Sequence, residues 1–137
     1  MISKNVIDHL RRKIGAQNVY HEREDLLVLG YDATPEIEGL PEVAVFPETR
    51  EGLEAALEVS RQEGLAVTPR GAATGLSGGS TPAAGGMILG LTRMNRILEI
   101  DEENLTATAE TGVITTQLFN AVAAHGLFYP PDPGSQN

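Results

Sequence analysis

One segment constrains this chain more than any other: a run of glycine, alanine and hydroxyl residues that directly follows an apolar, strand-like stretch. The run extends from Pro69 to Ser80 and contains four glycines. Glycines let the backbone adopt positive φ and come close to a ligand, and consecutive N–H groups can then form an anion-binding nest. Thr74 and Ser77 add hydroxyl donors. The pattern predicts either a phosphate-binding loop or a flexible, solvent-exposed connection.

Two common phosphate motifs do not fit this run. A P-loop needs a Gly-Lys-Ser/Thr ending, and no lysine lies near the segment. The dinucleotide fingerprint must lead into a helix, whereas Pro82 and Gly85-Gly86 lead here into another apolar strand-like stretch. We therefore expect neutral backbone donors, without a helix dipole, to hold the anion. Arg70 either contacts the phosphate directly or pairs with a carboxylate across the loop.

The first half of the chain has the pattern of alternating helices and strands. A helix is predicted from the Ser3 cap to Gly15, and residues 26–29 form a short strand or a packed loop. A buried strand at 43–46, a helix from Thr49 to Gly64 and a second buried strand at 65–68 form a right-handed β-α-β unit with parallel strands.

The second half has the pattern of an antiparallel structure. An apolar strand at 87–91 is followed by a hairpin, whose strands at 97–100 and 105–109 flank the acidic turn 101–104. The alternation in 105–109 predicts a half-buried strand, and a helix that ends at Gly126 follows.

Composition excludes several classes of function. A net charge of −9 argues against nucleic acid and anionic lipid as partners, and the absence of cysteine excludes disulfides and thiolate chemistry. No apolar run is long enough for a membrane span, and the polar start resembles no signal peptide, so we expect a cytoplasmic protein. The three histidines have no ligand spacing, and no metal site is expected. The sequence stops within a proline-rich loop, which suggests part of a longer protein.

Five ordered segments resemble the FAD-linked oxidases of the vanillyl-alcohol-oxidase (p-cresol methylhydroxylase) type. The central one is the Pro-Arg-Gly-Ala-Ala-Thr-Gly-Leu-Ser-Gly-Gly run at 69–79. The others are Tyr31-Asp32-Ala33 with the 41–47 stretch, residues 91–97, residues 110–113 and the Pro-Asp-Pro-Gly-Ser run at 131–135. Within this family the likeness is greatest to the branch that contains the D-type subunit of glycolate oxidase and the D-lactate dehydrogenases.

The resemblance implies a fold and a set of cofactor-binding residues. It implies an α+β fold, with a small parallel β-α-β subdomain followed by the start of an antiparallel one. The expected divisions are an entry segment at 1–40, the β-α-β unit and loop at 41–80, and an antiparallel part at 81–137. FAD would be held non-covalently. Its diphosphate would lie on the glycine-rich run at 69–79, and its flavin side near the Pro-Asp-Pro-Gly-Ser run at 131–135. The implied cofactor-binding residues are Pro69, Arg70, Gly71, Ala72, Ala73, Thr74, Gly75, Leu76, Ser77, Gly78, Asp132 and Ser135.

The resemblance also implies the FAD-binding part of a 2-hydroxy-acid dehydrogenase, with partner subunits in a glycolate oxidase complex. No catalytic residue can be transferred, because the matching positions lie beyond residue 137. Ala73 stands where relatives often carry glycine, so its φ decides whether the loop is strained there. The alternative is an inactive binding or assembly module. On either view we expect the 137 residues alone to bind FAD weakly or not at all and to self-associate.

Overall fold

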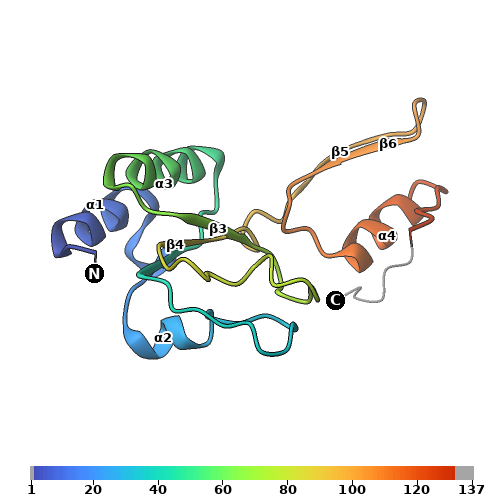
Figure 1. Ribbon diagram of the computed structural model, residues 1–137. Coiled ribbons are helices and arrows are strands. Elements are labelled where there is room, and N and C mark those ends of the chain that lie inside the picture. The colour runs from blue at the N-terminus through green and yellow to red at the C-terminus, as the bar shows by residue number, and fades with distance from the viewer. Residues whose placement is uncertain (1, 132–137) are drawn as a thin grey trace. The chain divides into compact units, whose positions relative to one another are not determined.

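The computed structural model describes residues 2–131, and its first unit, up to Arg93, is built around a four-stranded sheet (Figure 1). The strands are β1 (Val19–Tyr20), β2 (Val43–Val45), β3 (Val67–Arg70) and β4 (Met87–Gly90), in the order β1-β2-β4-β3. β4 pairs in parallel with both β2 and β3, and β1 is antiparallel to β2.

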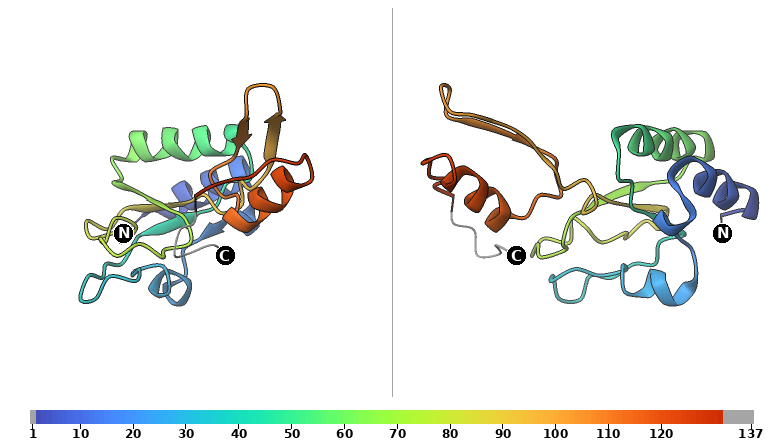
Figure 2. Two further views of the ribbon diagram at one scale, coloured as in Figure 1. Left: turned by 90° about the vertical axis from the view of Figure 1, so that its right-hand side faces the viewer. Right: turned by 180° about the vertical axis from the view of Figure 1, so that it is seen from behind.

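Helices cover both faces of this sheet (Figures 1 and 2). α1 (Lys4–Ile14) and α3 (Arg50–Glu63) lie on one face, and the short α2 (Arg23–Leu27) lies on the other. Alternate residues of the central strands point to opposite faces. The larger core, under α1 and α3, therefore takes Val43, Val45, Met87 and Leu89, while Ala44 and Ile88 pack with Leu26 of α2.

The boundaries of α1 and α3 follow from local capping, as the sequence predicts. The Ser3 hydroxyl accepts a hydrogen bond from Val6 N–H, and the Thr49 hydroxyl accepts one from Gly52 N–H. Gly15 ends the first helix and leads into a single 3-10 turn (Ala16–Asn18). Gly64 ends α3 in the left-handed conformation, with φ +64°.

The structure corrects three expectations in this half. Residues 26–29 do not form a strand, because α2 starts at Arg23 and turns Leu26 into the smaller core. β3 is an edge strand in which only Arg70 is buried, so it is not a buried strand as expected. β4, expected in the antiparallel part, lies between β2 and β3 and separates the two strands of the β-α-β unit. Both of these strands do belong to one sheet and run parallel.

The connection between β3 and β4 is unusual for parallel neighbours. Such strands are normally joined by a crossover helix, but residues 71–86 contain only turns and bends. This connection packs against the segment that precedes β2: a Cβ on Gly39 would lie 2.3 Å from the Pro82 carbonyl oxygen. The glycine-rich run is the first part of the connection.

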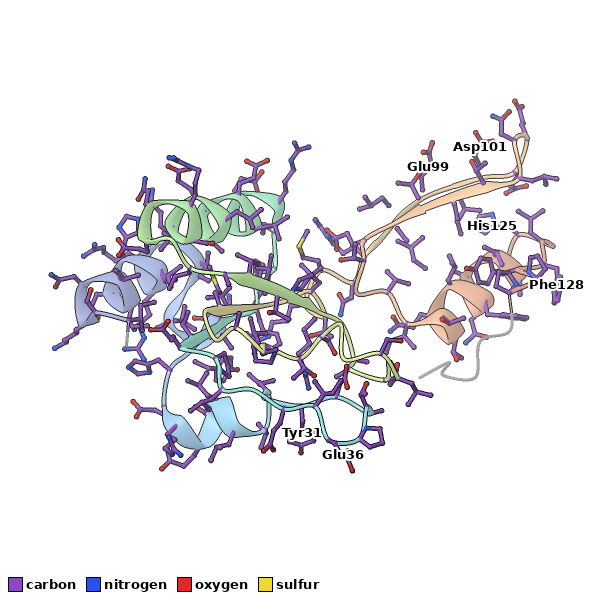
Figure 3. All side chains as sticks on the ribbon, in the orientation of Figure 1. Tyr31, Glu36, Glu99, Asp101, His125 and Phe128 are labelled. Carbon is purple, nitrogen blue, oxygen red and sulfur yellow. The ribbon has the colours of Figure 1, made fainter. Side chains whose placement is uncertain are left out.

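The second unit, from Met94, consists of a hairpin and a helix. The hairpin strands are β5 (Ile97–Asp101) and β6 (Thr106–Ala109), and the helix is α4 (Thr115–Ala123). Arg96 binds Glu110 at the open end of the hairpin. His125, labelled in Figure 3, has its Nδ1 2.6 Å from a Glu102 oxygen at the hairpin turn. β6 is exposed throughout, so the expected half-burial is wrong for the described residues.

The mixed fold, parallel first and antiparallel second, is confirmed. None of the helices within residues 2–131 is long and apolar enough to cross a membrane.

The start of β4 lies close to the chain before β3, and substitution of Gly86 should show how much stability this close approach requires. Its φ is +71°, and a Cβ would lie 2.3 Å from the Ala66 carbonyl oxygen, whereas a Cβ on Gly64 (φ +64°) would meet nothing within 4 Å. Gly64→Ala should therefore cost the left-handed penalty of about 1–2 kcal/mol, reduced by about 0.4–1 kcal/mol because alanine lowers the entropy of the unfolded chain. Gly86→Ala adds overpacking of about 1–3 kcal/mol. Urea unfolding of both variants checks this, and equal losses would contradict it.

Candidate functional site

The glycine-rich run leaves the sheet at the carboxyl end of β3. Pro69 and Arg70 are the last residues of that strand, and Gly71 to Ser80 follow it. In open sheets with parallel strands, ligands bind beyond the carboxyl ends of the strands. The run is thus at the edge of the sheet where a ligand site is expected.

The backbone N–H groups of residues 71–77 have no hydrogen-bond partner within residues 2–131. The side chains of Thr74 and Ser77 are exposed beside them. This agrees with the expectation of unpartnered donors; that they converge on one concave spot stays a prediction.

Three glycines of the run are not required by the protein's own packing. Gly71, Gly75 and Gly79 have φ outside the left-handed range, and a Cβ on each would meet nothing within 4 Å. A side chain would therefore fit these positions without strain or clash. Gly78 differs, because its φ is +68° and a Cβ would lie 3.0 Å from Ile37. The three open glycines leave room for something outside the chain to approach the backbone.

Ala73 is strained. Its φ is +59°, in the left-handed region that glycine adopts easily and alanine does not. The family resemblance led us to expect glycine at this position, and the condition for an unstrained alanine, a negative φ, is not met.

The two limbs of the loop are joined through Arg70. This side chain is only 8% exposed, and its Nη1 donates to the Ser80 carbonyl oxygen at 3.2 Å. Burial lowers the pKa of the guanidinium, and the charges of Asp32 and Tyr31 oppose that shift. Arg70 therefore has a structural contact within the loop, whether or not it also contacts a ligand.

Asp32 and Thr34, from the segment before β2, hold the returning limb. Thr34 Oγ1 accepts a hydrogen bond from Gly78 N–H at 2.7 Å, and Asp32 Oδ2 accepts one from the Ser80 hydroxyl at 3.1 Å. Asp32 belongs to a segment that resembles the family, but the sequence analysis does not predict it as a site residue. Nothing in the sequence indicates a role for Thr34. No local pattern marks them, because their partners lie 44 and 48 residues further along the chain.

Hydrogen bonds lower the pKa of Asp32. The largest contribution is the Thr34 N–H, which donates to Oδ1 at 2.8 Å, and Ser80 adds to it. The carboxylate is thus held in its charged form by donors from both segments.

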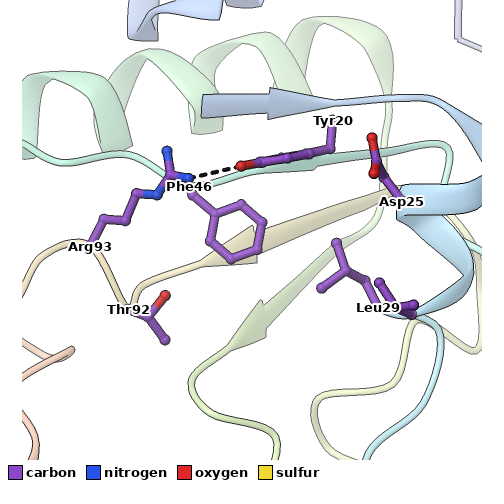
Figure 4. A pocket seen from close by; sticks show the side chains of 7 residues that line it. Tyr20, Asp25, Leu29, Phe46, Thr92 and Arg93 are labelled. Atoms are coloured by element: carbon purple, nitrogen blue, oxygen red, sulfur yellow. Dashed lines mark hydrogen bonds between the residues drawn. The ribbon is translucent and has the colours of Figure 1, made fainter. Parts of the chain in front are cut away.

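A second polar cluster lies at the carboxyl ends of β2 and β4 (Figure 4). The Arg93 guanidinium carbon lies 5.9 Å from the centre of the Tyr20 ring and 5.7 Å from that of Phe46. Arg93 also donates to the Tyr20 hydroxyl at 2.8 Å, to the Gln17 carbonyl oxygen at 3.1 Å and to the Asn18 side chain. A hollow of about 260 Å³ opens beside this cluster, with Asp25 and Leu29 in its lining. The many partners of Arg93 indicate that it fixes the end of β4.

The other candidate residues from the sequence analysis are the two expected near the flavin, the possible metal ligands and the acidic turn of the hairpin. Asp132 and Ser135 lie outside the described residues. Within residues 2–131, no three histidine or acidic side chains are grouped so that they could hold a metal ion. Asp101 accepts two hydrogen bonds from Asn104 and closes the hairpin turn.

Comparison with known proteins gives consistent matches. The family model of an FAD binding domain matches residues 41–137. Glycolate oxidase subunit GlcD of Bacillus subtilis is 42% identical over 98% of this chain and 29% of its own length. D-lactate dehydrogenase of Anaerostipes hadrus is 40% identical over 70% of this chain and 20% of its own length. The chain thus spans less than a third of these relatives.

Solved structures show the same fold. p-Cresol methylhydroxylase with substrate bound superposes with a TM-score of 0.79 at 24% identity, over 90% of this chain and 25% of that one. An alkyldihydroxyacetonephosphate synthase superposes with a TM-score of 0.87 at 15% identity, over the whole of this chain and 28% of that one.

Ala73→Gly should stabilise the chain. The change removes left-handed strain of about 1–2 kcal/mol and costs about 0.5–1 kcal/mol in unfolded-chain entropy, which leaves a net gain of up to about 1.5 kcal/mol. Ala72→Gly is the matched control, because the φ of Ala72 is not positive and only the entropic loss applies. Thermal unfolding of both variants measures the difference. A loss of stability in both would show that Ala73 is unstrained.

The lowered pKa of Asp32 predicts an acid-dependent contribution to stability. Since the folded-state pKa lies below the ordinary value of 3.8, the stabilisation is present above that value and is lost as the pH falls through the folded-state pKa. The difference in unfolding midpoint between the natural chain and Asp32→Asn should be larger at pH 7 than at pH 3. A difference independent of pH would contradict this assignment.

Proposed function

The chain belongs to the FAD binding domain family, whose cofactor is FAD, and on this basis we propose that residues 69–79 bind the diphosphate of FAD. The single observation that carries the proposal is the set of open glycines. Gly71, Gly75 and Gly79 leave the backbone uncovered where the fold itself would accept side chains. A diphosphate that lies directly against the backbone would account for their presence.

The donor chemistry of the loop fits a diphosphate. Seven consecutive residues, 71–77, have N–H groups without partners in the described structure, and Thr74 and Ser77 add hydroxyl donors. Arg70 donates to Ser80, so we assign it to anchoring the loop. Neutral donors then hold most of the anion, each with a net gain of about 0.5–1.5 kcal/mol. Asp132 and Ser135 remain proposed contacts to the flavin side.

We further propose that the chain is the cofactor-binding part of an FAD-linked 2-hydroxy-acid dehydrogenase of the glycolate or D-lactate type. The names of the relatives support this substrate class. When bound, the flavin supplies a two-electron acceptor. The role of the described residues is to bind and orient the cofactor, and the catalytic residues and partner subunits belong to the rest of the longer enzyme.

The exposed apolar side chains of the second unit support self-association of the 137 residues alone. Leu105 and Phe128 are 72% and 73% exposed, and Leu98 is more than half exposed. Such side chains favour association when nothing covers them. A dimer or larger species is expected by light scattering, and a clean monomer would contradict this.

Loop amides provide the test of FAD binding. In an NMR titration of the labelled chain with FAD up to about 1 mM, which detects binding as weak as about −4 kcal/mol, shifts should concentrate at residues 71–77. The double variant Gly71→Ala/Gly75→Ala should lose these shifts and keep or slightly raise its stability, because both sites accept a Cβ.

Gly64→Ala is the control for this titration, because it changes a glycine far from the loop and should leave the FAD shifts as they are. The proposal fails if FAD shifts amides elsewhere in the natural chain and not those of residues 71–77, or if the double variant binds FAD equally well.

A further inference from the structure

We propose that Asp32 and Thr34 are positioning residues that hold the return limb of the glycine-rich loop, residues 78–80, in the conformation that binds FAD. This inference rests on the proposed function. The two residues that it names lie before residue 41, where the match to the family model begins. The support acts through the return limb and needs no contact with the cofactor.

The return limb has three links to the segment before β2. Gly78 N–H donates to Thr34 Oγ1 at 2.7 Å, and the Ser80 hydroxyl donates to Asp32 Oδ2 at 3.1 Å. The third link is packing, because the Ile37 side chain lies so close to Gly78 that a Cβ there would be 3.0 Å from it. These links hold the two ends of the limb, Gly78 and Ser80, and restrain its path.

The supporting segment is itself a closed turn (Figure 3). Tyr31 forms a strand-like bridge with Glu38, and Gly39 N–H donates to the Gly30 carbonyl oxygen at 2.8 Å. Inside this turn, Asp32 Oδ1 accepts the Thr34 N–H at 2.8 Å, which fixes the Asp32 side chain relative to the Thr34 backbone. A side chain held in this way can hold its partner with little loss of entropy.

Ser80 connects this support to the outgoing limb. Its hydroxyl binds Asp32 and its carbonyl oxygen accepts from the buried Arg70, the last residue of β3. Both ends of the arc 71–77 are therefore fixed, while the arc keeps its donors free. Without the support, FAD would have to order the loop as it binds, and its affinity would fall.

The negative charge of Asp32 shows that this residue does not act by attracting the diphosphate. A carboxylate close to an anion-binding loop would repel a diphosphate, so attraction does not explain its presence there. Asp32 instead accepts hydrogen bonds from Thr34 and Ser80. Its role in the loop is that of an acceptor that orients donors.

Thr34 offers the cleanest experiment, because its hydroxyl can be removed with little change in shape. Thr34→Val removes the acceptor for Gly78, Thr34→Ser keeps it, and Thr108→Val is a matched change at an exposed position of β6. Two quantities are measured in each variant. One is amide hydrogen exchange at Thr81 and Ala83, whose N–H groups donate to carbonyl oxygens within the connection and not to Thr34. The other is the FAD titration described above.

In Thr34→Val we expect exchange at Thr81 and Ala83 at least tenfold faster and FAD affinity at least tenfold weaker. Thr34→Ser should restore both, and Thr108→Val should change neither. Exchange at the natural rate in Thr34→Val overturns the inference, as does unchanged FAD affinity. If FAD shifts amides of the natural chain other than those of residues 71–77, the proposed function fails, and exchange alone then decides whether the return limb depends on Thr34.

Discussion

The position of β4 between β2 and β3 is the constraint on which the rest of the first unit depends. Because β3 and β4 are parallel neighbours, the chain must travel back along the sheet before β4 can begin. α1 and α3 already occupy one face. The return, residues 71–86, has no helix of its own and relies on the turn around Asp32 for support. The same return contains the free N–H groups, so the topology and the candidate site have a common origin.

The electrostatics of the loop differ from those of phosphate sites built on lysine or a helix dipole. The chain is acidic overall, and the cation in the loop, Arg70, is buried and donates to a carbonyl oxygen. Asp32 places a negative charge beside the return limb. In the site that we propose, FAD binding would depend on the number and placement of neutral donors, and so on the backbone conformation. For this reason we assign a role to the positioning contacts, and the strain at Ala73 bears on the proposed site.

Local features of the structure could be predicted from the sequence, and non-local ones could not. Ser3, Thr49 and Gly64 mark helix ends through contacts within a few residues, and all three function as predicted. The location of β4 depends on pairing with a strand more than 40 residues earlier in the chain. The periodicity of apolar residues does not show which strands pair. For the same reason Thr34 was missed and β3 was expected to be buried. The apolar run at 26–29 fits a strand or a helix equally well, and the polar residues before it decide for the helix. In the candidate site, the glycine pattern marked the loop that we propose as the FAD site, whereas the positive φ of Ala73 became known only from the structure.

The open glycines have a consequence for how this chain can change over generations. Mutations at Gly71, Gly75 and Gly79 cost the fold nothing in clashes or strain, so selection for a folded protein cannot preserve them. Gly86 is different, since the fold itself requires it. In a lineage that stopped using the cofactor, the three open positions would diverge first, while Gly86 and the core stayed the same. The relative rates of change at these two kinds of glycine would then record the loss of a ligand before any loss of the fold.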